Sequence, residues 1–404
     1  MVNSTMMVTL SAVKHDKTYD VIVVGGGTAG AIAAIAAAES GKDVLIVERG
    51  YSLGGSATMA QVTPFMTVRI GEYCNSYVST RMQRILTENG YMTPPWPGAS
   101  NTMFSPVTMA SVLEDMCVGA GIDLHYGGTF VDVVKEGDTL KGLLVQTVSG
   151  LLMIEGAMFI DCTGDAQVAF ASGCPYAAGD PEDDNNNQNM SLRFAVGDID
   201  IPKVNQALYD LGDHTADPNS KHCYMAMEWK WKGEEAPLTK LFKEGLENGE
   251  LEWADGVYFQ VFAAESYGDS VMYFNCPEAP HCRHTTDVFE VAQGVVDCRA
   301  SAMRIHKFLK AHLGGFENSQ IISFAQIPGI RESRRIEGEY LVTIDDYNDR
   351  RKFKDGIAQS AYPIDVHGKS ELVHPRGFAP GEFFEIPYSA LVPKTVNNLL
   401  VAGR

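Results

Sequence analysis

The stretch that most constrains the fold is residues 19–48, which has the pattern of a strand, a glycine-rich turn, a helix and a second strand. Gly25, Gly27 and Gly30 have the G-x-G-x-x-G spacing. The first glycine permits a tight turn, the second lets a pyrophosphate approach the backbone, and the third lets the helix pack on the strand. Glu48 ends the second strand, where a carboxylate can accept hydrogen bonds from ribose hydroxyls. The unit predicts dinucleotide binding.

The composition argues against several classes of protein. A chain of 404 residues can bury a large core and divide into two or three domains. Its formal charge of −19 disfavours nucleic acid and anionic membranes as partners, because both require a basic face. The sequence contains no apolar run long enough for a membrane span, and residues 1–17 lack the pattern of a signal peptide. The eight cysteines have no framework spacing, which is typical of reduced thiols in a cytoplasmic protein.

Further motifs indicate which dinucleotide binds. The glycine pair Gly54-Gly55 follows the second strand in RGYSLGGSATM, and Thr163-Gly164-Asp165 follows a later buried strand in FIDCTGDAQVAFASG. The C-terminal part contains IPGIRESRRIEGEYLVTIDD (327–346), YPIDVHG (362–368) and IPYSALVPKTVNNLLVAGR (386–404). From about residue 19 to its end the sequence resembles the FAD-oxidored family of FAD-dependent oxidoreductases, with a glutathione-reductase-like flavin domain.

The resemblance implies that FAD is held by the first glycine turn and Glu48, with Gly55 near the pyrophosphate and the backbone of Val131 against the adenine. The expected contacts also include Gly25, Gly27, Thr28, Ala29, Gly30, Arg49, Ser56, Thr163, Gly164, Asp165 and Gly403. In the family the closing VAGR is followed by a loop and a helix whose N-terminal backbone lies by the flavin ring. This sequence stops at Arg404, so we expect it to lack that helix and to hold FAD less tightly than an extended version.

Two absences from the sequence indicate the route of the electrons. There is no second G-x-G-x-x-G for an NAD(P)H domain and no C-x-x-C for a redox-active dithiol. We therefore expect electrons to pass directly between FAD and a small-molecule substrate, with a separate electron donor or acceptor completing the cycle. Cys276, His281, Cys282 and His284 lie close together in sequence, but their spacing matches no standard zinc pattern, so we expect no metal site.

Three residues are candidates for catalysis. His367 can take a proton from an alcohol or amine while hydride leaves the adjacent carbon, and a structural histidine is the alternative. Arg331 can bind a substrate carboxylate or the charge of a reduced flavin. Alternatively, Arg331 belongs with Arg334 and Arg335 to an ion-pair network that braces two domains. Tyr388 can line the flavin site, although aromatic packing explains it equally well.

The sequence therefore predicts an α/β fold: a Rossmann-like FAD-binding domain, with a parallel sheet and a β-meander, and an inserted mixed α+β substrate domain. The predicted divisions are an N-terminal arm (1–17), FAD-binding parts (18–60, 105–178 and a truncated 390–404), a loop and short-helix insertion (61–104) and a substrate domain (179–389).

The expected reaction is dehydrogenation of a small polar organic substrate by hydride transfer to flavin N5. One alternative is an FAD-dependent reductase of an activated double bond, and another is a non-catalytic or inactive flavoprotein fragment. The sequence identifies neither the substrate nor the oligomeric state.

Overall fold

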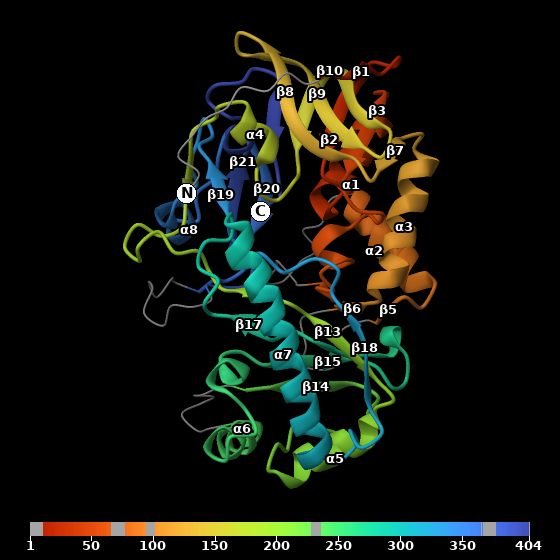
Figure 1. Cartoon of the computed structure of the whole chain (residues 1–404), viewed down its shortest axis with the longest axis vertical. Coiled ribbons are helices and arrows are strands. Elements are labelled where there is room, and N and C mark those ends of the chain that lie inside the picture. Colours follow the sequence, from red (N-terminus) through yellow and green to blue (C-terminus); the bar gives the residue numbers. More distant parts are fainter. Residues whose placement is uncertain are drawn as a thin grey trace.

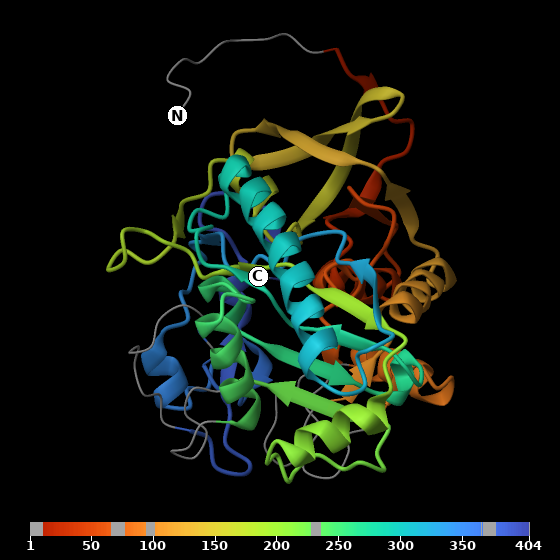
Figure 2. The same ribbon diagram turned by 60° about the horizontal axis from the view of Figure 1, so that its bottom comes forward.

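The computed structural model describes residues 11–65, 77–93, 102–227, 236–364, 366 and 377–403. These residues form two lobes stacked along the long axis, each built on its own sheet (Figure 1). The long helix α7 (Val288–His312) runs from the middle of the molecule along the second lobe to its lower end. Seen from the second direction, α7 crosses in front of the strands of that lobe (Figure 2).

The sheet of the first lobe has eight strands and is part parallel, part antiparallel. The long strand β10 serves both parts: Gly156–Asp161 pairs in parallel with β2 and β22, and Gly150–Glu155 pairs in antiparallel fashion with β9. The strands are β1 (Val13–Lys14), β2 (Tyr19–Val24), β3 (Val44–Glu48), β7 (Asp123–Tyr126), β8 (Thr129–Glu136), β9 (Thr139–Thr147), β10 (Gly150–Asp161) and β22 (Leu399–Val401). The predicted α/β class, with a parallel sheet and a β-meander, is confirmed.

Strands β2 and β3 are apolar along their length because both faces of the sheet are covered. One face packs on three helices, α1 (Thr28–Glu39), α2 (Tyr77–Glu88) and α3 (Pro106–Gly119). The other face packs on the meander and on α4 (Gln167–Ala171). The predicted strand–turn–helix–strand unit is therefore present, and its turn lies at the carboxyl end of β2.

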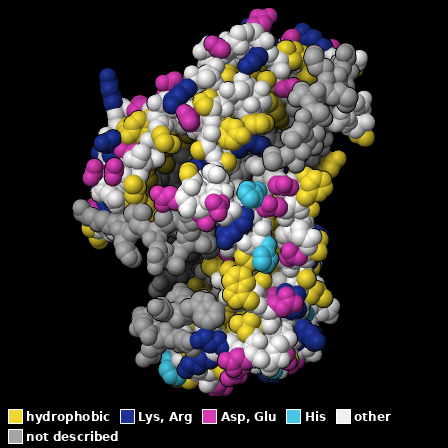
Figure 3. Space-filling view, turned by 60° about the vertical axis from the view of Figure 1, so that its left-hand side comes forward, with side chains coloured by type: hydrophobic (Ala, Val, Ile, Leu, Met, Phe, Trp, Pro, Cys, Tyr) yellow, Lys and Arg dark blue, Asp and Glu magenta, His cyan; other side chains and the backbone are white. Residues whose placement is uncertain are grey.

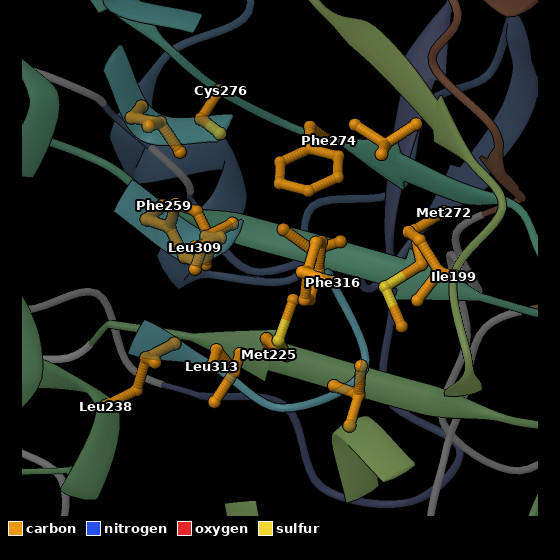
Figure 4. Packing of buried hydrophobic residues seen from close by; sticks show 14 of the residues in the cluster. Ile199, Met225, Leu238, Phe259, Met272, Phe274, Cys276, Leu309, Leu313 and Phe316 are labelled. Atoms are coloured by element: carbon orange, nitrogen blue, oxygen red, sulfur yellow. The ribbon is translucent and has the colours of Figure 1, made fainter. Parts of the chain in front are cut away.

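The second lobe consists of a five-stranded antiparallel sheet with helices on one face. Its strands, in spatial order, are β14 (Cys223–Ala226), β15 (Gln260–Ala263), β16 (Met272–Phe274), β13 (Phe194–Gly197) and β18 (Gln320–Phe324). Its helices are α5 (Ile201–Asp210), α6 (Pro237–Glu247) and α7. Phe274 and Phe316 lie in the core between them, beside Leu309 and Met225 (Figure 4).

Short elements connect and flank the two lobes. They are η1 (Gly55–Ala57), β4 (Pro64–Phe65), β5 (Met92–Thr93), β6 (Thr102–Phe104), β11 (Tyr176–Ala178), β12 (Met190–Ser191), η2 (Trp253–Gly256), η3 (Glu265–Tyr267), β17 (Glu278–Ala279), β19 (Arg334–Ile336), α8 (Ile344–Asn348), β20 (Gly356–Ser360), β21 (Phe384–Pro387) and η4 (Tyr388–Leu391). The pairs β12–β17 and β11–β19 hold residues 329–336 against both lobes.

Two details concern a helix start and the N-terminal arm. Asp287 caps α7, because its carboxylate accepts hydrogen bonds from the backbone N–H groups of Phe289 and Glu290. Within the expected N-terminal arm (1–17), Val13 and Lys14 pair with β10, and Lys14 forms an ion pair with Glu155.

The surface mixes both signs of charge on the face shown in Figure 3, where acidic and basic side chains are interspersed. Within the described ranges, no helix combines the length and the apolar character needed to cross a membrane.

Candidate functional site

A cleft of about 360 Å³ opens at the carboxyl ends of the parallel strands of the first lobe. Residues from seven separate stretches of the sequence line it: Val24, Gly25, Gly27, Thr28, Ala29, Val47, Glu48, Arg49, Gly55, Ser56, Met59, Gly128, Thr129, Phe130, Cys162, Thr163, Gly164, Asp165, Gln167, Ile327, Pro328, Ile330 and Gly403. This position is where open α/β sheets bind their ligands.

The three glycines of the first turn have different surroundings. Gly25 has φ +94°, and a Cβ there would collide with the carbonyl of Cys162. A Cβ on Gly30 would collide with the carbonyl of Gly25, so Gly30 serves the packing of helix on strand and does not line the cleft. A Cβ on Gly27 would meet no protein atom within 4 Å and would project into the cleft. The backbone at Gly27 therefore leaves room for a group bound in the cleft.

The N-terminus of α1 faces the same space. Gly27 is its N-cap, and no side chain accepts hydrogen bonds from its first N–H groups. Thr28 and Ala29 line the cleft, and the Thr28 hydroxyl donates to the Gly54 carbonyl. Free N–H groups and the positive end of the helix dipole favour an anion such as a pyrophosphate.

Glu48 is held rigidly at the edge of the cleft. Its side chain is 5% exposed, and its two carboxylate oxygens accept hydrogen bonds from the N–H groups of Gly26 and Gly50, both at 2.7 Å. Each oxygen keeps a further lone pair, so the carboxylate can still accept a ribose hydroxyl. Arg49 lines the cleft beside it.

The second glycine pair lies against the first turn. Gly54 N–H donates to the Gly26 carbonyl, and Gly54 forms a bridge with Gly27. Gly54 and Gly55 both have positive φ, and a Cβ on Gly55 would lie 3.0 Å from the Cα of Gly27. Two backbone segments that approach this closely form one wall, to which Ser56 also contributes.

The turn after β10 is organised by Asp161, which is 1% exposed. Its carboxylate accepts hydrogen bonds from the N–H and hydroxyl of Thr163 and from the N–H of Ala169. Burial raises the pKa of Asp161, and these hydrogen bonds oppose the rise. The result is a fixed turn in which Thr163, Gly164 and Asp165 line the cleft.

The expected contact of the Val131 backbone with the adenine stays a prediction, and the residues just before Val131 line the cleft. Gly128, Thr129 and Phe130 line the cleft, whereas Val131 is 41% exposed and is not among the lining residues. The pairing of β8 with β9 is irregular between Phe130 and Asp132, which alters which side chain faces inward. An irregularity of this kind leaves no signal in the alternation of residue types.

Gly403 lines the cleft next to the start of α1. It has φ +108°, and an added Cβ would lie 3.7 Å from the Cβ of Ala29. The preceding Ala402 N–H donates to the Asp161 carbonyl, which ties the end of β22 to the turn after β10.

The arginines after Gly329 have separate partners. Arg331 donates from Nη2 to Glu278 Oε1 at 3.2 Å, and Glu278 is 3% exposed. Arg334 donates to the Asp165 carbonyl and lies over the ring of Phe170. Arg335 pairs with Glu332 and donates to the Gly179 carbonyl. These contacts link both lobes to the cleft wall, as the ion-pair interpretation expects, and a ligand role for Arg331 stays a prediction.

Of the other two catalytic candidates, the structure describes only Tyr388. Tyr388 is 45% exposed in η4, where its N–H donates to the Asp355 carbonyl, and it is not a lining residue. His367 lies outside the described residues.

The sequence reasoning missed several lining residues. They are Val24, Val47, Met59, Gly128, Thr129, Phe130, Cys162, Gln167, Ile327, Pro328 and Ile330. Val24 and Cys162 directly precede predicted turns, so their place at strand ends was a usable signal. Ile327, Pro328 and Ile330 come from a segment that only tertiary structure brings to this edge.

A glycine-lined cleft with an uncapped helix N-terminus and a carboxylate at the end of the second strand defines a nucleotide-binding α/β protein. The family comparison specifies it further: the chain belongs to the family described as FAD dependent oxidoreductase, whose model matches residues 20–404. FAD is therefore its cofactor, and the open space at Gly27 fits that group.

Individual relatives match over short stretches. A soluble pyridine nucleotide transhydrogenase of Mycobacterium bovis is 47% identical over 53 residues, which cover 13% of this chain and 11% of that protein. A menaquinone reductase of Mycobacterium tuberculosis is 30% identical over 105 residues, covering 25% and 26%. A vinyl phenol reductase of Lactiplantibacillus plantarum is 44% identical over 52 residues, covering 13% and 10%. The chain thus spans about a quarter or less of these relatives.

Among solved structures, p-nitrophenol 4-monooxygenase from Pseudomonas putida has a TM-score of 0.48 at 11% identity, covering 80% of this chain and 71% of that one. A geranylgeranyl bacteriochlorophyll reductase-like protein from Thermoplasma acidophilum has a TM-score of 0.45 at 14% identity, covering 77% and 66%.

Proposed function

We propose that the chain is an FAD-dependent dehydrogenase that removes hydride from a small polar organic substrate. The observation that carries the proposal is that one cleft joins the two glycine turns and Glu48 to the wall formed by Ile327, Pro328 and Ile330. That wall leads directly into Arg331, so a nucleotide and a substrate-binding group would share one space. When bound, FAD supplies the hydride acceptor.

The residues of the first lobe bind and orient the nucleotide in this proposal. The N–H groups at the start of α1 hold the pyrophosphate, and Glu48 accepts the ribose hydroxyls. Gly55 and Ser56 form the facing wall, and Thr163, Gly164, Asp165 and Gly403 complete the enclosure. The β8–β9–β10 meander beside the parallel sheet supports the closer analogy with a glutathione-reductase-like flavin domain.

Two side chains act on the substrate in this proposal. His367 accepts the proton from the oxygen or nitrogen of the alcohol or amine. The hydride would leave the adjacent carbon for the bound flavin. Arg331 contacts an anionic group of substrate or flavin through its free Nε. Tyr388 is not assigned a role, because its η4 position is exposed.

The second candidate is a reductase of an activated double bond. The names of two relatives, a menaquinone reductase and a vinyl phenol reductase, favour it. The two directions differ in what reduces the flavin. A dehydrogenase is reduced by its own organic substrate, whereas a reductase requires an outside donor such as a reduced dye.

The test is anaerobic flavin reduction in a panel of sugars, amines and hydroxy acids, after denaturation has shown that the protein releases FAD. We expect one class of substrate to bleach the flavin, and His367→Ala to retain FAD while slowing bleaching about 100-fold. His214→Ala, in an exposed loop, is the matched control. Bleaching by a reduced dye alone would favour the reductase, and release of FMN, or of no flavin, would exclude both.

A further inference from the structure

The face of the five-stranded sheet opposite its helices carries an apolar cluster around Phe262 and, beside it, polar side chains. Phe194 and Phe274 are cross-strand partners in the helix-covered core, and Phe274 points into it in Figure 4. Because side chains alternate along a strand, their neighbours Arg193 and Asn275 are expected on the other face. Asn275 there donates to Gln260 Oε1 at 2.7 Å. This face is unusual because it buries a cation.

Arg193 is 8% exposed, and its hydrogen bond is from Nη1 to the Gln61 carbonyl at 3.3 Å. Across the residues that the structure describes, no carboxylate lies within ion-pair distance of it. Arg304 in the same lobe shows the usual arrangement: it donates twice to the buried Asp255 and also pairs with Glu252. A buried guanidinium without a carboxylate is costly unless an anion joins it.

Further polar atoms near this face lack partners. Among the buried side-chain atoms without a hydrogen bond are Thr63 Oγ1, Tyr267 OH, Asn275 Oδ1 and Arg331 Nε. The Tyr267 hydroxyl lies within reach of the Thr63 hydroxyl and near Arg193, so the two hydroxyls can share one hydrogen bond. One hydroxyl and Arg331 Nε then remain to donate, which is what an anion requires.

The cluster adjoins the wall of the FAD cleft. Met59 and Ile330 line the cleft, and Arg331 follows Ile330 directly. Gln326 N–H donates to the Met59 carbonyl, and Gln61 Nε2 donates to Ser323 Oγ at 2.9 Å, so the chain beyond Met59 lies on the second sheet. A molecule held at the cluster would therefore lie next to the cofactor.

We propose that Arg193, together with Arg331, binds the carboxylate of a monoanionic substrate at the boundary of the two lobes. The inference rests on the proposed function, since it names the substrate class of that site. Glu278 balances the charge of Arg331, whereas no described carboxylate balances that of Arg193. The described side chains therefore leave one uncompensated positive charge, on Arg193. One carboxylate neutralises it, and the planar guanidinium fork matches its geometry. A phosphate dianion would leave an excess of negative charge.

The electrostatics agree with this assignment. Burial, followed by the neighbouring charge of Arg331, lowers the pKa of Arg193 to about 10. A carboxylate bound between the two guanidinium groups would oppose both effects by favouring the charged forms.

The test compares Arg193→Met with the parent protein, both loaded with FAD, by thermal unfolding and by the flavin absorption spectrum. Acetate, lactate and glycolate are the probes, with acetamide and lactamide as neutral matches and phosphate as the other anion. We expect carboxylates to raise the unfolding temperature of the parent and to perturb its flavin spectrum. Arg193→Met should bind them at least about 10-fold more weakly, yet unfold at the same or a higher temperature without anion, because it removes an uncompensated buried charge.

Arg304→Met is the matched control. It removes an arginine that has carboxylate partners, so it should lower the unfolding temperature and retain the carboxylate response. The proposal is overturned if no carboxylate acts on the parent, if phosphate binds more tightly than the carboxylates, if Arg193→Met responds like the parent, or if that variant loses stability as Arg304→Met does. A protein that holds FAD but is reduced by no organic substrate would refute the proposed dehydrogenation, while thermal unfolding would still decide the carboxylate site.

Discussion

At the scale of single residues, identical glycines in one motif have different tasks that the structure separates. Gly25 needs its positive φ and the close approach of Cys162, Gly30 needs contact with the Gly25 carbonyl, and Gly27 needs neither. The N-cap conformation of Gly27, φ −61°, is open to other residues. Its lack of a side chain is therefore useful only to a ligand.

This difference predicts opposite effects on stability and FAD binding when a methyl group is added at Gly27 or at Gly30. Gly27→Ala should leave the free energy of unfolding of the FAD-free protein nearly unchanged and weaken FAD binding by about 10-fold or more, because the methyl group occupies the pyrophosphate space. Gly30→Ala should lower the unfolding free energy itself, because its methyl group has no room. Urea unfolding and FAD titration of both variants provide the check. Strong destabilisation by Gly27→Ala would contradict the assignment.

A second residue-scale prediction concerns Cys162, whose backbone supports the Gly25 turn. Burial raises the pKa of its thiol to about 12 from a usual value near 9. Above pH 9 the unfolded chain loses this proton while the folded protein keeps it, so stability present below pH 9 falls as the pH rises toward 12.

The loss attributable to this thiol is about 1 kcal/mol per pH unit in that range. Other buried thiols contribute in the same direction, so the measurement is the difference in slope between the parent and Cys162→Ala, from urea unfolding at pH 8 to 10.5. Identical slopes would show that Cys162 does not titrate as described.

At the scale of elements, the sequence predicted those whose signals are local. The strand–turn–helix–strand unit at 19–48 follows from apolar runs and glycine spacing. Elements defined by distant pairing were not predicted. The pairing of β11 with β19 joins residues more than 150 positions apart, and nothing in either short segment indicates its partner.

The residues of the candidate site likewise fall into those that local motifs predicted and those that the sequence reasoning missed. The turns at Gly25, Gly55 and Thr163 were predicted from motifs, whereas Phe130 was missed because an irregular pairing in β8 shifts the inward side chain. Arg193 did leave a signal that was not used: in SLRFAVG it is a lone cation inside an apolar strand. A charge at such a position requires a partner, and the structure shows none among the described carboxylates.

At the scale of the whole molecule, the first lobe is assembled from segments far apart in the chain. Strand β22 pairs in parallel with β10, and Gly403 beyond it lines the cleft. The side chain of Asn398 makes the attachment: it accepts from Leu140 N–H and donates to the carbonyls of Leu140 and Ala157, at 2.8 to 2.9 Å. Asn398 is 9% exposed, so water cannot easily replace these bonds.

Asn398→Ala should therefore reduce both stability and FAD affinity. The buried N–H and carbonyl of Leu140 would lose their partners at about 1 kcal/mol each, giving a loss of about 2 kcal/mol in the free energy of unfolding, while the carbonyl of the exposed Ala157 can turn to water. FAD affinity should fall as well, because β22 positions Gly403 at the cleft wall and a loosened strand would bind FAD only in the fraction of molecules where it is docked. The neighbouring Asn397, whose side chain is exposed, provides the matched control Asn397→Ala, which should change neither quantity. Urea unfolding and FAD titration measure the two effects. A loss of stability without a loss of FAD affinity would mean that β22 supports the sheet but not the cleft.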